Sequence, residues 1–215
     1  MDVNELRYGN PTIEQLDYLT KKTFVDVLFE ELSSFTFPKN SSESTKEELN
    51  QIADSISALS GQEEYINRYK VYDRNLIPYF KKGLTKDTET FEQISVLIDD
   101  IIEDTTPILL KLKYHFQRPR PYQLAEFFKL KLFPYKSYSC DSPSFPSAQA
   151  YHGKILTEVI GNTYPEIYAY MQSLFEDICY SRVHMGLHYQ SDIDVGIFCA
   201  EKVIQMKEFA TKYKL

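Results

Sequence analysis

The residues best suited to chemistry lie near the C-terminus, where Arg182, His188 and Asp192 occupy the fixed positions of S-R-x5-H-x3-D. Residues four apart share one face of a helix. The Asp192 carboxylate would therefore accept a proton from one ring nitrogen of His188 and leave the other nitrogen free to attack. The planar guanidinium of Arg182 suits phosphate oxygens. An anion site beside an activated imidazole indicates phosphoryl transfer through a phosphohistidine.

Matching cations are needed, because an isolated His-x3-Asp pair is more often a surface helix pair than a catalytic one. Residues 111–121 supply such cations, since Lys and Arg seven apart lie two turns along one helical face. Two registers of K-x6-R-P fit this segment, Lys111 with Arg118 and Lys113 with Arg120.

A Pro-Ser turn at Pro146 and Ser147 lies between these two segments. Such a turn at the start of a helix presents unpaired backbone N–H groups and a hydroxyl to an anion. The three segments therefore predict a phosphate site built from helix ends.

In this order the segments resemble the type 2 phosphatidic acid phosphatase superfamily, whose motifs are K-x6-R-P, P-S-G-H and S-R-x5-H-x3-D. That superfamily includes bacterial class A non-specific acid phosphatases and vanadium haloperoxidases. The resemblance is closest to the class A enzymes, because residues 181–194 fit every fixed position of their third motif, S-R-V-x2-G-x-H-x-Q-S-D-x-D. Their first motif, K-x4-R-x-R-P, selects Lys113, Arg118, Arg120 and Pro121.

The resemblance covers roughly residues 105–200 and implies an all-α helical bundle of this superfamily's type. It also implies a phosphoric ester or anhydride hydrolase in which His188 attacks phosphorus and Asp192 fixes its tautomer. No cofactor or metal is expected, and phosphate or vanadate is the expected occupant of the site. The expected phosphate ligands are Lys113, Arg120, Ser147, Ala148, Gln149 and Arg182, with Lys111 and Arg118 as the second choice.

One departure from the family pattern bears on catalysis. Gln149 stands where the family has the His that protonates the leaving oxygen, and an amide has no titratable proton to give. Ala148 replaces the family's Gly and tolerates fewer backbone conformations. His152, one helical turn further on, is either a substitute acid or a partly exposed helix residue.

Two other functions remain open at this point. The loss of the acid favours a phosphate- or phosphoester-binding protein with lost or reduced turnover. A vanadate-dependent haloperoxidase is the weaker alternative, because that chemistry also uses the His that Gln149 replaces.

Composition sets the remaining bounds. A chain of 215 residues is sufficient for a single helical domain, 1–215, and its net charge of −7 argues against nucleic-acid binding. No apolar run approaches the ~18 to 20 residues of a membrane helix, and no signal peptide is seen, so we expect a cytoplasmic protein without a membrane span. The three cysteines predict neither a zinc site nor a disulfide framework. The expected partner is a small-molecule phosphoester or phosphoanhydride, and the sequence does not indicate an oligomeric state.

The expected elements are helices throughout. Residues 1–90 carry no recognised motif, and 91–212 form the motif-bearing core. Arg182 and His188 are six apart and would not share a helical face, so the chain must turn near Gly186. Helices are expected over 12–34 and, with breaks, from Thr45 to about Phe80. A helix over 88–117 follows, in which Pro107 marks a kink or a new start. After a loop at 130–146, helices are expected over 147–161, 165–185 and 189–212.

Overall fold

The computed structural model describes residues 2–74, 80 and 88–215, and within them it contains helices and no β-strand. The all-helical class expected from the sequence is therefore confirmed. None of the described helices is long and apolar enough to cross a membrane. The α-helices are α1 (Ile13–Thr20), α2 (Phe29–Ser33), α3 (Glu43–Leu59), α4 (Glu63–Arg74), α6 (Thr88–Phe116), α7 (Pro121–Ala125), α8 (Ala148–Thr163), α9 (Tyr168–His184), α10 (Gln190–Gln205) and α11 (Lys207–Tyr213), and the 3-10 turns are η1 (Val3–Glu5), η2 (Phe24–Leu28), η3 (Glu126–Phe128) and η4 (Pro165–Ile167).

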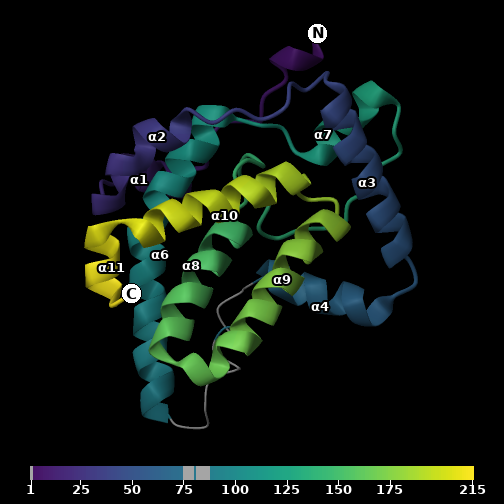
Figure 1. Ribbon diagram of the computed structural model, residues 1–215. Coiled ribbons are helices and arrows are strands. Elements are labelled where there is room, and N and C mark those ends of the chain that lie inside the picture. The colour runs from purple at the N-terminus through teal and green to yellow at the C-terminus, as the bar shows by residue number, and fades with distance from the viewer. Residues whose placement is uncertain (1, 75–79, 81–87) are drawn as a thin grey trace.

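The centre of the molecule is α8, which packs against α6, α9 and α10 (Figure 1). Apolar residues four apart form the buried stripes, as in Ile108 and Leu112 of α6 or Ile155 and Val159 of α8, and all four side chains are fully buried. Each such side chain contributes roughly 1.5–3 kcal/mol by leaving water. Because α8 and α9 run in opposite directions around η4, the start of α8 and the end of α9 lie at the same end of the pair (Figure 1).

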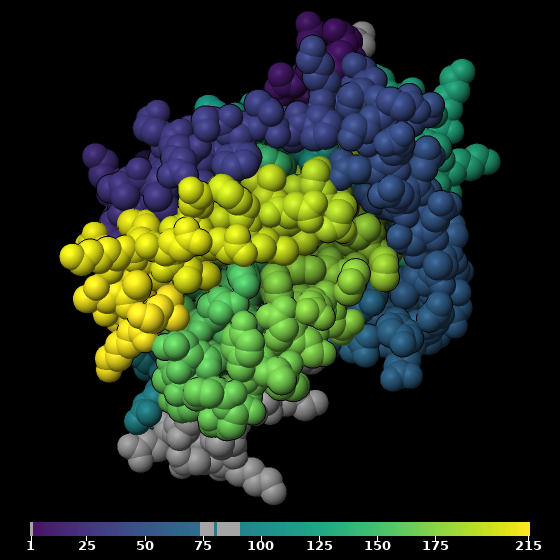
Figure 2. All heavy atoms as spheres, in the orientation of Figure 1, coloured from purple at the N-terminus to yellow at the C-terminus, as the bar shows by residue number. Residues whose placement is uncertain are grey.

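Residues 2–74 pack onto the motif-bearing helices. The early helices α1 and α2 contact α6, whereas α3 and α4 contact α9. In the face shown in Figure 2, the N-terminal segments border α10 and α9 along the upper and right-hand edges. The first part of the chain is therefore placed to contribute side chains to the motif region.

Pro107 lies inside α6, so it does not start a new helix as one reading of the sequence allowed. Proline removes one intrahelical hydrogen bond, and the remaining bonds of this 29-residue helix continue on both sides. The helix reaches Phe116 and thereby delivers Lys113 in its last turn.

The prediction of one helix over 12–34 is wrong, because the segment forms α1, η2 and α2. Lys21 ends α1 in an extended conformation, with ψ 138°. Thr23 then starts a new turn, in which its backbone N–H donates to the Asp26 carboxylate at 3.1 Å. A local side-chain cap overrides the continuous apolar spacing here.

The second helix begins at Glu43 and not at the predicted Thr45. The hydroxyl of Ser42 accepts from the Thr45 backbone N–H at 3.2 Å, which makes Ser42 the N-cap. The expected helical spacing toward Phe80 holds through α4, while residues 75–79 lie outside the described part of the chain.

The prediction of one helix over 189–212 is also wrong. Met206 is extended, with φ −63° and ψ 128°, and separates α10 from α11. The change of direction allows Phe209 and Tyr213 of α11 to be buried, with 0% and 5% of their surface exposed. By contrast, α8 and α9 match the predicted helices closely, and the predicted loop at 130–146 contains no helix.

Candidate active site

The turn that follows α9 brings Arg182 and His188 together. Gly186 adopts φ +75°, and the backbone N–H of Leu187 donates to the Arg182 carbonyl at 3.0 Å, which is the bond pattern of a Schellman cap. The backbone N–H of His188 donates to the same carbonyl at 3.2 Å. The turn expected near Gly186 therefore exists, and it folds His188 back toward Arg182.

His188 is held by a hydrogen bond on each ring nitrogen. Its Nδ1 lies 3.0 Å from Asp192 Oδ2, and its Nε2 lies 2.8 Å from Arg120 Nη1. A guanidinium is always a donor, so Nε2 is the acceptor and Nδ1 carries the hydrogen. Burial, followed by the positive charge of Arg120, holds the pKa of His188 well below its ordinary value. The neutral imidazole therefore keeps its lone pair on Nε2.

Asp192 is fixed through its second oxygen. Arg118 Nη1 donates to Asp192 Oδ1 at 2.6 Å, and Arg118 Nη2 donates to Glu48 of α3 at 3.1 Å. The guanidinium of Arg118 stacks 3.8 Å from the centre of the Tyr189 ring. Burial raises the pKa of Asp192, but the Arg118 and His188 contacts outweigh burial and hold it below its ordinary value. Arg118 thus stabilises the carboxylate that orients His188.

Lys113 and Arg120 approach from the end of α6 and the start of α7. The Lys113 ammonium donates to the Pro143 carbonyl at 2.7 Å, and the Arg120 guanidinium donates to the Ser142 carbonyl through Nε and Nη2. Both cations are 1% exposed. Burial and the charge of Arg120 hold the pKa of Lys113 well below its ordinary value.

Lys111 and Arg118, the second-choice pair of the first motif, lie in different parts of the structure. Lys111 donates to Asp26 Oδ2 at 2.7 Å and to the Lys21 carbonyl at 2.6 Å, on the side of α6 that faces the N-terminal elements. Only its partner Arg118 contacts the His188 and Asp192 pair, through Asp192. The structure therefore gathers Lys113 and Arg120 around His188 and leaves Lys111 apart.

The Pro-Ser turn opens α8 next to α10. Ser147 is the N-cap of α8, and its backbone N–H donates to the Asp192 carbonyl at 2.9 Å. A Cβ added at Gly196 would lie 2.7 Å from the Ser147 carbonyl, so the two helices approach closely at this glycine. Gln149 Nε2 donates to Ser139 Oγ at 2.9 Å. Ala148 is the first residue of α8.

Arg182 is fully buried and paired. Its Nη1 donates to Asp73 Oδ1 at 2.8 Å, and its Nη2 donates to Ser139 Oγ at 3.2 Å and to Cys140 Sγ at 3.3 Å. The Nε–H has no partner among the described residues. These contacts use three of the five N–H groups of the guanidinium, so the Nε–H and one Nη1–H are left for a further acceptor.

His152, the residue considered as a substitute acid, lies on α8 beside α6. Its Nε2 is 3.5 Å from Thr106 Oγ1, and none of its hydrogen bonds among the described residues reaches Arg120, Arg182 or His188. Burial, followed by the charge of Lys113, lowers the pKa of His152 to about 3. The ring is therefore neutral at ordinary pH and carries no imidazolium proton that it could give to a leaving group.

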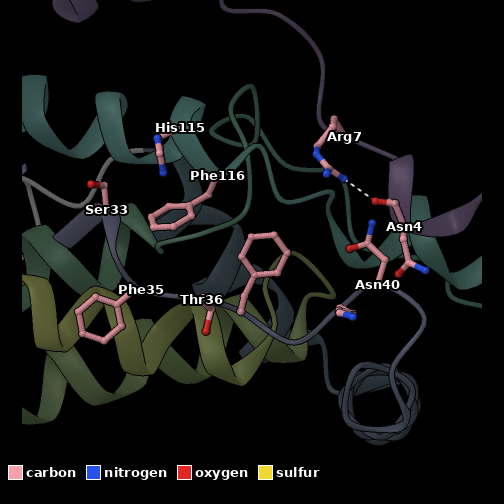
Figure 3. A pocket seen from close by; sticks show the side chains of 10 residues that line it. Asn4, Arg7, Ser33, Phe35, Thr36, Asn40, His115 and Phe116 are labelled. Atoms are coloured by element: carbon pink, nitrogen blue, oxygen red, sulfur yellow. Dashed lines mark hydrogen bonds between the residues drawn. The ribbon is translucent and has the colours of Figure 1, made fainter. Parts of the chain in front are cut away.

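A cavity of about 480 Å³ lies elsewhere, between the connection from α2 to α3, the N-terminal residues Asn4 and Arg7, and the end of α6 (Figure 3). The rings of Phe35, Phe37 and Phe116 line it together with His115, and none of the expected site residues does. Phe37 and Phe116 also pack against Phe145, so an aromatic layer separates this cavity from the Pro-Ser turn.

Three polar residues of the site were missed from the sequence: Glu48, Asp73 and Ser139. Glu48 and Asp73 are single carboxylates inside helical patterns of the first ninety residues, and Ser139 lies in a loop. Their pairing with Arg118 and Arg182 is a long-range contact, for which residue spacing provides no signal.

Comparison of the chain with models of known protein families gives no match, and comparison with curated proteins gives none either.

Proposed function

We propose that the chain is a phosphohydrolase that forms a phosphohistidine at His188. The observation that carries the proposal is the neutral, buried imidazole with Nδ1 on Asp192 and Nε2 facing the cations. Such a pair is the arrangement of an activated nucleophile with a group that orients it. The three segments that meet here are those whose motifs resemble the class A acid phosphatases.

Buried cations beside the nucleophile support this proposal. Lys113 and Arg120 are each 1% exposed and form no ion pair with a described carboxylate, and burying charge without a counter-charge is costly. A phosphoryl group would supply that counter-charge, whereas Arg182 already has Asp73. The phosphoryl oxygens would accept from Arg120 Nη1, released from His188, and from the unpaired Nε–H of Arg182.

The reaction proceeds in two displacements. In the first, the lone pair on His188 Nε2 attacks phosphorus, and the bond to the leaving oxygen breaks with its electrons remaining on that oxygen. In the second, a water oxygen attacks phosphorus, the P–N bond breaks and its electrons return to Nε2. The water proton passes to solvent. Asp192 keeps the Nδ1 hydrogen in place during both steps.

Gln149 restricts the first displacement. Its amide donates to Ser139 and has no proton to release, and His152 is neutral and bonded to Thr106. The leaving group therefore departs unprotonated, which favours aryl esters and anhydrides over alkyl esters.

The same observation favours a second function, a phosphate- or phosphoester-binding protein with reduced turnover. In the present arrangement Arg120 Nη1 bonds the attacking nitrogen, and neither Gln149 nor His152 supplies a proton. Binding of phosphate without hydrolysis of any ester would distinguish this function from catalysis.

The deciding experiment is to trap the intermediate. Quenching turnover of a labelled aryl phosphate should leave a protein-bound phosphate that is stable in alkali and released in acid, as expected of a phosphoramidate. The label should vanish in His188→Ala and persist in His115→Ala, which removes an exposed histidine from the end of α6. Hydrolysis without a label at position 188 would exclude the proposed intermediate.

A further inference from the structure

Asp73 of α4 is an internal anion bound next to the proposed phosphoryl site. Its Oδ1 accepts from Arg182 Nη1 at 2.8 Å and from the hydroxyls of Ser137 and Ser139, both at 2.7 Å. Its Oδ2 accepts from the Tyr138 backbone N–H. The carboxylate is 3% exposed and is bound on both oxygens, as an oxyanion ligand would be.

This carboxylate is ionised in the folded protein. Burial raises the pKa of Asp73, but the Arg182 guanidinium and the hydrogen bonds from Tyr138 and Ser137 outweigh it, so the pKa lies below its ordinary value. Asp73 is therefore the counter-charge of Arg182 and binds one of its terminal nitrogens.

The charge of the site follows from the ion pairs. The connected cluster holds the cations Lys113, Arg118, Arg120 and Arg182 and the carboxylates Glu48, Asp73 and Asp192. The three guanidiniums balance the three carboxylates and His188 is neutral, so the net positive charge of the site is at most the one that Lys113 carries, whose pKa burial and Arg120 hold well below its ordinary value. Without Asp73 the site would hold one positive charge more.

We infer that Asp73 is a specificity-determining residue that adapts the site to phosphoryl groups carrying one negative charge, the class to which phosphodiesters belong. The inference rests on the proposed function, since it concerns the same site. A phosphodiester carries one charge, whereas an unprotonated phosphomonoester carries two. The second negative charge of a phosphomonoester would lie on the other side of the Arg182 guanidinium from the Asp73 carboxylate. Two negative charges separated by one guanidinium repel each other strongly in a buried site.

The geometry of Arg182 agrees with this inference. Asp73, Ser139 and Cys140 accept from three of its five N–H groups, which leaves the Nε–H and one Nη1–H for a phosphoryl group. The Asp73 carboxylate and a phosphoryl group would therefore bind the same guanidinium, which brings their negative charges close together.

The test compares two substrates at about pH 8, p-nitrophenyl phosphate with two charges and its methyl ester with one. We expect the wild type to favour the methyl ester in kcat/KM, and Asp73→Asn to shift the ratio toward the doubly charged ester by about tenfold or more. Asp73→Glu, which keeps the charge, should keep the wild-type preference.

The matched control is Asp177→Asn. Asp177 of α9 accepts from Arg68 and Tyr72, the residue before Asp73, and so anchors α4 without contacting Arg182. Its substitution should leave the ratio of the two substrates within about twofold of the wild type. An equal shift in both variants would assign the effect to the placement of α4 and overturn the inference.

Binding separates this inference from the proposed function. Calorimetry with dimethyl phosphate and methyl phosphate should show the same change of preference in Asp73→Asn, whether or not any ester is hydrolysed. If the binding ratio shifts in Asp73→Asn but no ester is hydrolysed, the proposed hydrolase activity is wrong and the inference about Asp73 is supported. An unshifted ratio in Asp73→Asn would overturn the inference about Asp73. A wild type that prefers the doubly charged probes would also overturn it, and this outcome needs no variant, so it decides the question even if Asp73→Asn fails to fold.

Discussion

The two ring nitrogens of His188 have different partners, and this asymmetry is what makes the residue useful. Asp192 holds the Nδ1 hydrogen, while a cation holds the lone pair of Nε2. A phosphoryl group that took over the Arg120 N–H would free that lone pair and lie against it. Substrate binding and exposure of the nucleophile would thus be one event.

Removal of the nucleophile gives the first prediction. His188→Ala should reduce hydrolysis of an aryl phosphate by about a thousandfold or more, as loss of a nucleophile does elsewhere. Asp192→Asn should cost less, because the ring remains but loses its fixed tautomer. His115→Ala should stay near the wild type. Retention of more than about a tenth of the activity in His188→Ala would remove this residue from the mechanism.

The pH profile gives the second prediction. The pKa of His188 is held well below its ordinary value by burial and by Arg120, so we expect no protonation of the ring as the pH falls from about 7 through the ordinary histidine pKa of about 6.5. Single-turnover rates on an aryl phosphodiester, whose own charge does not change in this range, should therefore be flat. A loss of rate with an apparent pKa near 6.5 would show that His188 titrates as an ordinary histidine.

The leaving group gives the third prediction. With Gln149 in place of an acid, the rate should fall steeply as the leaving-group pKa rises from nitrophenol to alkyl alcohols. Gln149→His should restore part of the rate on alkyl esters, within the ~10²–10⁴-fold that general acids contribute. His152→Ala should not change the slope, because that ring is neutral and bonded to Thr106. A flat dependence in the wild type would mean that another group donates the proton.

At the scale of elements, the sequence predicted the helix ends and turns that depend on contacts between residues close to one another in the chain. The Pro-Ser start of α8, the turn at Gly186 and the end of α6 beyond Lys113 were all predicted, because each depends on residues within a turn of one another. The breaks at Lys21 and Met206 were not, since apolar spacing continues across both.

The contacts of the site divide in the same way. The His188 and Asp192 pair was predicted from a spacing of four. The carboxylates Glu48 and Asp73 lie more than a hundred positions from Ser191 and Arg182, and only the packing of α3 and α4 on α9 brings them in. Glu48 and Asp73 contact residues that the motifs did predict. The sequence therefore indicated the cations of the site but not the carboxylates that pair with them.

The turn at Gly186 gives the fourth prediction. Gly186→Ala forces a side chain into φ +75°, and its Cβ would lie 2.7 Å from Ile56 Cδ1 and 3.3 Å from the Pro134 Cα. We expect a loss of about 1–2 kcal/mol from the backbone strain alone, a further loss from the contacts, and slower hydrolysis because the turn places His188. Gly61→Ala carries the same strain at φ +80° in open space, and it separates the two effects. Equal denaturation midpoints for the two variants would show that Ile56 and Pro134 give way freely.

At the scale of the whole molecule, a chain of net charge −7 concentrates cations at one buried point. Lys113 comes from α6, Arg120 from the start of α7 and Arg182 from α9, and each is held by backbone carbonyls or by a carboxylate. Folding thus buries charged groups, among which Lys113 and Arg120 have no described carboxylate partner, at a cost that an anion would offset. The stability of the fold and the occupancy of the site should therefore be linked.

That linkage gives the fifth prediction. An anion that binds only the folded chain stabilises it by about 2.7 kcal/mol at a hundred times its Kd, and each kcal/mol raises Tm by roughly 2–4 °C in a chain of this size. Millimolar phosphate or vanadate should therefore raise Tm, and Arg120→Ala or Lys113→Ala should reduce the increase. Lys111→Ala is the matched control, because Lys111 lies on the same helix but pairs with Asp26 away from His188. It is expected to lower Tm without phosphate and to leave the phosphate-induced rise unchanged. If Lys111→Ala and Lys113→Ala reduced the rise equally, phosphate would be acting through the charge of α6 in general and not through the site around His188.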